Sequence, residues 1–131
     1  MAYSVSTLDH YERPRNVGAF GDNEAGVGSA LVAAPAGGDV LRLQIKVDAR
    51  TDVVEEARFK THGCVAAIAA SSLLTEWVRG KTLEQAASLK SSQIVQALAL
   101  PPEKIYCAML AEDAIKAAVE DYRNRHSRQP P

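Results

Sequence analysis

The alternation of apolar and polar side chains over residues 41–47 constrains the fold of this chain more than any other feature. Apolar residues stand at every second position with polar ones between them, namely Leu41, Leu43, Ile45 and Val47 against Arg42, Gln44 and Lys46. This period of two is typical of a β-strand with one face in the core and one in water. Residues 56–61 repeat it. The short link at 48–52 predicts that the two strands form an antiparallel hairpin.

After Gly63 the pattern becomes helical. Residues 65–78 are rich in Ala and Leu, with apolar residues at helical spacing and Gly80 as a stop signal. Thr82 and Gln85 resemble a capping box that opens a short helix, and further helices are expected from about Ser92 and over about 107–125. With a third strand at 29–34, the strands precede these helices. The order predicts an α+β fold, in which a small three-stranded antiparallel sheet packs against a helical half.

The length of 131 residues predicts a single domain, 1–131. A mobile N-terminal segment is expected over about 1–28, with any short helix ending before Pro14, and a disordered tail over about 127–131. Fifteen basic and sixteen acidic residues give a net charge of −1, which favours neither nucleic acid nor a membrane as partner. Two cysteines and an N-terminus without a signal or transit pattern predict a cytoplasmic protein with reduced thiols.

Three places carry side chains with useful chemistry. They are a tight turn ending in Asp39, the strand–helix junction at Cys64, and the start of the last helix at Cys107. A thiol at a helix N-terminus is favoured as thiolate, the form that binds metal and accepts sulfur. Spacing by itself leaves plainer interpretations open. A free cysteine is usually a small buried hydrophobe, an aspartate after two glycines is usually a turn residue, and no CxxC or HxxxH motif is present.

Five segments, in order, resemble the IscU/NifU-type family of iron–sulfur cluster assembly scaffolds over essentially the whole chain apart from the tail. They are MAYSVSTLDHYERPRNVGAF, VGSALVAAPAGGDVLRLQIKV, EEARFKTHGCVAAIAASSLLTEWVRGK, LPPEKIYC and LAEDAIKAAVEDY. The resemblance implies an IscU/SufE-like fold and a non-enzymatic function, which is to assemble a [2Fe–2S] cluster and pass it to apo iron–sulfur client proteins. It also implies a cysteine desulfurase, and a DnaK-type chaperone with its J-domain co-chaperone, as partners.

The family's ligand set carries over only in part. Asp39, Cys64 and Cys107 match it, but the family's P-A-C-G-D turn is PAGGD here, so Gly37 stands at the first cysteine position. Tyr106 stands where the family has a histidine, and His62 stands where the family has an aromatic residue. Both are weaker candidate ligands. The alternative interpretation of His62 is a surface residue of the strand. Because a [2Fe–2S] cluster takes four protein ligands, we expect iron or a labile cluster at this site, and Zn²⁺ at the apo site.

The family's chaperone-recognition motif, L-P-P-V-K, has a counterpart with one changed position. It corresponds to Leu100, Pro101, Pro102, Glu103 and Lys104, with Glu103 in place of an apolar residue. Burying an unpaired carboxylate in a groove costs several kcal/mol, so the charge predicts weakened recognition.

Three functions remain open at this point. The first is a scaffold that binds iron or a labile cluster and accepts sulfur from the desulfurase. The second is a divergent paralogue that docks the desulfurase or chaperone and modulates them. The third is a persulfide carrier using Cys107. That thiol is expected to be the more reactive one because it opens the last helix near Lys104, whereas apolar residues 65–67 surround Cys64.

Overall fold

The computed structural model describes residues 3–21, 24–34 and 38–127. The elements follow one another along the chain in the order α1 Val5–Glu12, β1 Val27–Ala33, β2 Val40–Asp48, β3 Val53–His62, α2 Val65–Val78, α3 Leu83–Ala87, α4 Ser91–Leu98, the 3₁₀ turn η1 Pro102–Lys104 and α5 Ile105–Ser127. A three-stranded sheet precedes the main helices, which confirms the α+β prediction.

The sheet has the order β1-β2-β3, and both neighbouring pairs are antiparallel. The predicted hairpin over residues 48–52 is confirmed, with Leu43 of β2 opposite Phe59 of β3 and Ala30 of β1. These three side chains face the same side and are buried in the core. The alternation therefore specified both the strands and the face that meets the helices.

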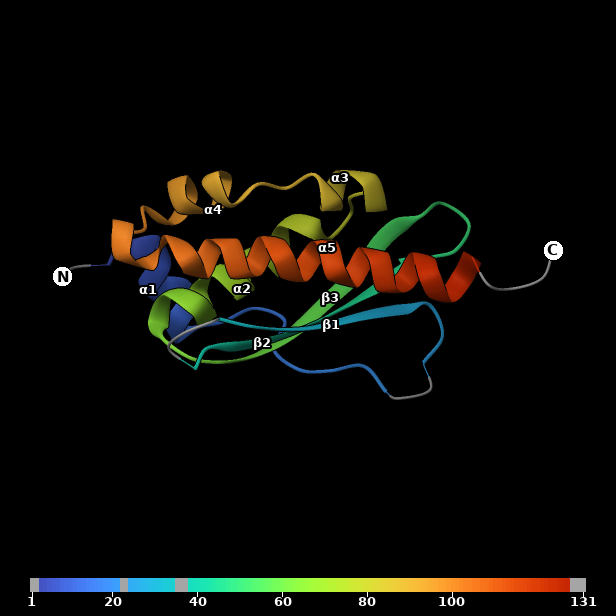
Figure 1. Ribbon diagram of the computed structural model, residues 1–131, viewed down its shortest axis with the longest axis horizontal. Coiled ribbons are helices and arrows are strands. Elements are labelled where there is room, and N and C mark those ends of the chain that lie inside the picture. Colours follow the sequence, from blue (N-terminus) through green and yellow to red (C-terminus); the bar gives the residue numbers. More distant parts are fainter. Residues whose placement is uncertain (1–2, 22–23, 35–37, 128–131) are drawn as a thin grey trace.

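One face of the sheet is covered by helices (Figure 1). The long helix α5 lies along β1 and β2, α2 lies on β3, and α3 and α4 pack on α5. The helices and strands share one buried apolar cluster that includes Leu74 of α2, Ile94 of α4 and Ile115 of α5. In the part of the chain that the structure describes, no helix is long and apolar enough to cross a bilayer.

Local signals in the sequence fix the ends of the helices. The α2 helix spans the predicted residues, and Gly80 follows it at φ +85°. The predicted capping box is present at α3, where the hydroxyl of Thr82 accepts from the N–H of Gln85 and the Gln85 side chain accepts from the N–H of Thr82. A Cβ at Gly28 would collide with the carbonyl of Ala118, so the absence of a side chain lets β1 approach α5 closely.

The alternation predicts that the other face of the sheet is exposed to water. In the structure, part of this face is covered. The segment before β1 runs along β3, where Gly18 N–H donates to the Phe59 carbonyl at 2.9 Å, and then places Phe20 over the sheet. The N–H of Phe20 donates to Oε1 of Gln44, which is 7% exposed. The prediction that Gln44 faces water is therefore wrong, because a segment distant in sequence covers it.

The mobility of residues 1–28 and the disordered tail remain predictions; residues 1–2, 22–23 and 128–131 lie outside the described part of the chain.

Candidate metal and sulfur site

Three elements bring their chemically active side chains to one end of the sheet. Asp39 directly precedes β2, and Cys64 follows β3 as the residue that caps the N-terminus of α2. The hairpin places the start of β2 opposite the end of β3, with Val40 paired to His62. Cys107 lies in the first turn of α5, which begins at this end of the sheet. The sequence predicts that Gly37, Asp39, Cys64, Tyr106 and Cys107 cluster at one end of the domain. Asp39, Cys64 and Cys107 do so and Tyr106 lies with them, whereas Gly37 lies outside the described residues.

The donor atoms of Asp39, Cys64 and Cys107 all lie within 4.8 Å of one another. The two sulfur atoms are 3.6 Å apart, and the sulfur of Cys64 is 3.8 Å from Oδ2 of Asp39. Two sulfur ligands and one carboxylate at this spacing form a donor set for a borderline-soft cation such as Zn²⁺ or iron. Gly37, the position that lacks the family's first cysteine, lies outside the described residues and has no side-chain donor.

The carboxylate of Asp39 is held at the centre of the site although it is almost fully buried. Its Oδ1 accepts from the backbone N–H of Cys64 at 3.2 Å, and its Oδ2 accepts from the hydroxyl of Tyr106 at 2.9 Å. A Cβ at residue 63 would collide with this carboxylate, so Gly63 is the residue that lets it approach α2. The sequence marks Gly63 only as the residue before a cysteine, and its contact with Asp39 is visible only in three dimensions.

Tyr106 acts as a hydrogen-bond donor in this arrangement. Its bond to Asp39, together with its contact with Cys64 and partial burial, raises the pKa of the phenol well above its usual range. A phenol held in its neutral form is a poor metal ligand, because metal binding by tyrosine uses the phenolate. Tyr106 therefore orients the carboxylate of Asp39. It remains a weaker candidate metal ligand than Asp39, Cys64 and Cys107.

The physical premise for a reactive Cys107 is wrong. We expected the helix N-terminus and Lys104 to favour its thiolate, but its side chain is fully buried, and burial together with the neighbouring Cys64 raises its pKa to about 12. Desolvation disfavours the charged form more than the helix terminus stabilises it. Cys64 is the more accessible thiol, since it is half-buried. We also expected the apolar residues 65–67 to bury Cys64 more deeply than Cys107, and this expectation is wrong.

Lys104 supplies positive charge at the mouth of the site. The neighbouring Cys64 is the largest cause that raises the pKa of Lys104, and the Lys104 ammonium lies 5.9 Å from the centroid of the Tyr106 ring.

The remaining predicted site residues lie around this cluster. His62 is exposed at the end of β3 and is not among the described residues that form the three-donor group. In the chaperone-recognition counterpart, Leu100 is buried in the core whereas Pro102 and Glu103 are exposed. The segment adjoins the site, since η1 leads directly into α5.

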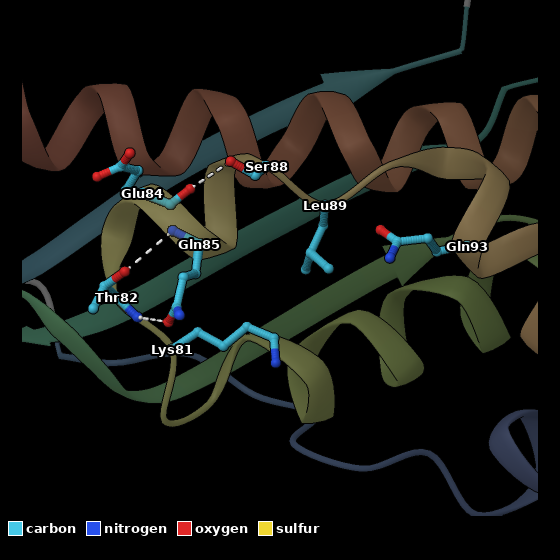
Figure 2. Close-up of a pocket in the computed structure, with 7 residues that line it drawn as sticks. All are labelled: Lys81, Thr82, Glu84, Gln85, Ser88, Leu89 and Gln93. Atoms are coloured by element: carbon cyan, nitrogen blue, oxygen red, sulfur yellow. Dashed lines mark hydrogen bonds between the residues drawn. The ribbon is translucent and has the colours of Figure 1, made fainter.

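A surface hollow elsewhere in the molecule lacks such a donor set. Figure 2 shows it between α3 and the start of α4, lined by Lys81, Thr82, Glu84, Gln85, Ser88, Leu89 and Gln93. The hydroxyl of Thr82 and the side-chain amide of Gln85 serve the capping box of α3, and the Ser88 hydroxyl bonds the backbone of Glu84. Because these polar groups are satisfied locally, the hollow is a less suitable ligand site than the cluster around Asp39.

The fold and the thiol–carboxylate cluster define a small α+β protein whose described residues include a group that could hold a metal ion at the end of its sheet. A family model described as the NifU-like N terminal domain matches residues 2–129. The chain belongs to this IscU/NifU-type family of iron–sulfur cluster assembly scaffolds.

Individual relatives support the same assignment. The chain is 58% identical over 125 residues to the iron–sulfur cluster assembly scaffold protein IscU of Escherichia coli (strain K12), which is 95% of this chain and 97% of that protein. The same figures hold for the IscU of Azotobacter vinelandii. The fold is shared with the crystal structure of a nitrogen-fixing NifU-like protein (N-terminal) from Brucella abortus, at a TM-score of 0.69 and 16% identity, covering 93% of this chain and 94% of that chain.

Proposed function

We propose that this protein is an iron–sulfur cluster assembly scaffold that binds iron or a labile [2Fe–2S] cluster and accepts sulfur from a cysteine desulfurase. The observation that carries the proposal is the convergence of Asp39, Cys64 and Cys107, with all donor atoms within 4.8 Å. The proteins named IscU that resemble the chain over most of its length support the same function. In this role the protein holds its cargo without turning over a substrate, so it is not an enzyme.

The proposed cargo is weakly held because the ligand set is incomplete. A [2Fe–2S] cluster takes four protein ligands, and Asp39, Cys64 and Cys107 supply three. Gly37 offers no donor atom, and the neutral phenol of Tyr106 is a poor substitute. The same three donors with one water molecule also satisfy Zn²⁺, so zinc competes for the apo site.

The proposed partners follow from the site and its neighbouring segment. A desulfurase delivers sulfur at the mouth of the site, where Cys64 is the accessible thiol. A DnaK-type chaperone with its J-domain co-chaperone reads residues 100–104, with affinity reduced by Glu103, and promotes transfer of the cluster to apo client proteins. The exposed positions of Pro102 and Glu103 support docking there, while buried Leu100 has to leave the core to be read.

The glycine at position 37 favours a second candidate function, a persulfide carrier that never completes a cluster. Sulfur acceptance needs only one thiol, whereas a cluster needs four ligands. Burial of Cys107 moves the expected acceptor in this role from Cys107 to Cys64. A paralogue that docks the desulfurase or chaperone and only modulates them differs from both, because it leaves both thiols unmodified.

Anaerobic reconstitution with ferrous iron, cysteine and a desulfurase tests the proposal, read by visible absorbance and by iron and sulfide analysis. We expect bound iron and sulfide in the unchanged protein, and loss of both in Cys64→Ser and Asp39→Ala. His62→Ala is the matched control, since His62 lies at the same end of the sheet but outside the three-donor group. Iron binding that survives Cys64→Ser, or is absent from the unchanged protein, contradicts the scaffold function.

A further inference from the structure

The two cysteines of this chain form an isolated pair of thiols. The chain has only Cys64 and Cys107, and their sulfur atoms are 3.6 Å apart. Two thiols that join in a disulfide release two electrons, which is the number needed to reduce one sulfane sulfur atom to sulfide. We propose that the pair performs this reduction: Cys64 takes up a sulfane sulfur as a persulfide, and Cys107 attacks it, releasing sulfide and leaving a Cys64–Cys107 disulfide.

The different burial of the two thiols assigns their roles. Cys64 is half-buried, so an incoming persulfide or polysulfide reaches its sulfur from solvent. Cys107 is fully buried and contacts Cys64 from the protein side. Once a sulfur atom has been added to Cys64 from solvent, the Cys107 sulfur, 3.6 Å from that of Cys64, is the nearby thiol that attacks. Attack by Cys107 on the Cys64 sulfur then expels the outer sulfur atom toward solvent, as thiol–disulfide exchange requires.

The atoms and electrons of this step balance. The S–S bond of the Cys64 persulfide breaks, and the Sγ–Sγ bond between Cys64 and Cys107 forms. The outer sulfur keeps the electron pair of the broken bond and the hydrogen it already carries. The Cys107 thiol gives up its proton as it attacks, and that proton joins the outer sulfur, so that it departs as hydrogen sulfide. The sulfane sulfur is reduced, the two cysteine sulfurs are oxidised, and a low-molecular-weight dithiol resets the pair.

Polar groups around the pair are arranged to assist this proton transfer. Oδ2 of Asp39 lies 3.8 Å from the sulfur of Cys64 and accepts the Tyr106 hydroxyl at 2.9 Å. The Tyr106 oxygen is also 3.8 Å from the Cys64 sulfur. A carboxylate and a hydroxyl therefore lie beside the Cys64 sulfur, where they are placed to hand a proton to the departing sulfide. The Lys104 ammonium lies 5.9 Å from the centroid of the Tyr106 ring and so brings a positive charge to this end of the site, where it stabilises the negative charge of the sulfide as it leaves.

This inference deepens the proposed function and rests on the sulfur acceptance that the proposal includes. It differs from that proposal in one respect: the electrons that reduce the sulfur come from within the site. A third cysteine at position 37 would give a persulfide a further thiol to react with, whereas the chain with Gly37 offers only this one pair. The product is free sulfide, the species that bridges the irons of a cluster.

The test uses the full reduced chain, loaded by a brief pulse of cysteine persulfide under anaerobic conditions and then desalted. Intact-mass measurement follows the species that has gained one sulfur atom, and a sulfide probe follows release. We expect the added sulfur to be lost from the unchanged protein while sulfide and the intramolecular disulfide appear in equal amounts. In Cys107→Ser the persulfide at Cys64 is expected to persist at least about tenfold longer, because the intramolecular nucleophile is missing.

Control variants separate this chemistry from misfolding and from the scaffold function. Circular dichroism checks that Cys107→Ser and Cys107→Ala fold, and both must show the same persistence. Sulfide release from Cys107→Ser at the unchanged rate, absence of the disulfide in the unchanged protein, or persulfide at Cys107 in Cys64→Ser at the unchanged yield overturns the inference. The test uses a chemical sulfur donor and no desulfurase. If a desulfurase fails to deliver sulfur, or iron fails to bind, the proposed function is contradicted, but sulfide release by the cysteine pair is not.

Discussion

At the scale of single residues, the carboxylate of Asp39 organises the site. It accepts hydrogen bonds from the backbone of Cys64 and from Tyr106, and Gly63 leaves room for it. The sequence was sufficient to predict that Asp39, Cys64 and Cys107 belong together, because the matching segments cover the whole chain. It was not sufficient to predict that Tyr106 donates to Asp39 or that Cys107 is buried, since both depend on how α5 packs against the sheet.

The burial of Cys107 predicts the order in which the thiols react. With a limiting pulse of an alkylating reagent at neutral pH, we expect Cys64 to be labelled at least about tenfold faster than Cys107, because the Cys107 side chain is fully buried and its pKa is raised to about 12. Mass spectrometry of the two cysteine peptides measures the ratio. In denaturant the two rates should become similar, and faster labelling of Cys107 in the folded protein would contradict the structure.

At the scale of elements, α1 is attached to the rest of the molecule by polar contacts that the sequence did not reveal. The hydroxyls of Ser4 and Thr7 both donate to the carbonyl of Leu98 at the end of α4, at 2.6 and 2.8 Å. Buried His10 lies 2.8 Å from the Ser72 hydroxyl of α2. The sequence predicted only that any short helix here ends before Pro14, because single-sequence patterns contain no information about partners ninety residues away.

His10 predicts a loss of stability in acid. Burial lowers its pKa in the folded protein below the usual 6.5, so the unfolded chain binds more protons, and the free energy of unfolding falls as pH drops below about 6.5. Above that pH the contribution is complete. Denaturant titrations between pH 5 and 7.5 should show the slope, and His10→Gln should reduce it. An unchanged slope in His10→Gln would refute this assignment.

The contact between β1 and α5 makes Gly28 intolerant of a side chain. A Cβ there meets the carbonyl of Ala118 and Tyr122, and backbone atoms cannot move aside cheaply. Gly28→Ala is therefore expected to lower the free energy of unfolding by about 1–3 kcal/mol. Gly21→Ala is the matched control, since no atom lies within 4 Å of a Cβ at that position. Chemical denaturation measures both, and equal stabilities for the two variants would rule out the close approach.

Glu103 predicts the strength of chaperone recognition. In peptides covering residues 98–106, replacing Glu103 by Val should increase affinity for a DnaK-type chaperone on the order of a hundredfold, because the groove no longer has to bury a carboxylate. Fluorescence anisotropy with the two peptides measures the difference. Equal affinities would mean that this side chain points to solvent in the complex, as it does in the free protein.

At the scale of the whole molecule, the fold could be predicted from the sequence. The segment that covers the face of the sheet opposite the helices could not. Strand alternation, the short hairpin link and the helix signals at Gly80 and Thr82 act over a few residues, and each was confirmed. The burial of Gln44 under Phe20 required long-range contacts that leave no local pattern. The fold thus keeps the family's architecture, and its described residues bring three donor groups, Asp39, Cys64 and Cys107, together at one end of the sheet.

The central claim is that this fold carries a cluster site with an incomplete ligand set, and a chelator challenge tests it most directly. Protein reconstituted anaerobically is mixed with excess chelator, and the decay of its visible absorbance is compared with that of Gly37→Cys. We predict that the unchanged protein loses its iron at least about tenfold faster, because cysteine at position 37 supplies the missing fourth ligand. A cluster that resists the chelator in the unchanged monomer, or equal lifetimes in the two proteins, would contradict the account.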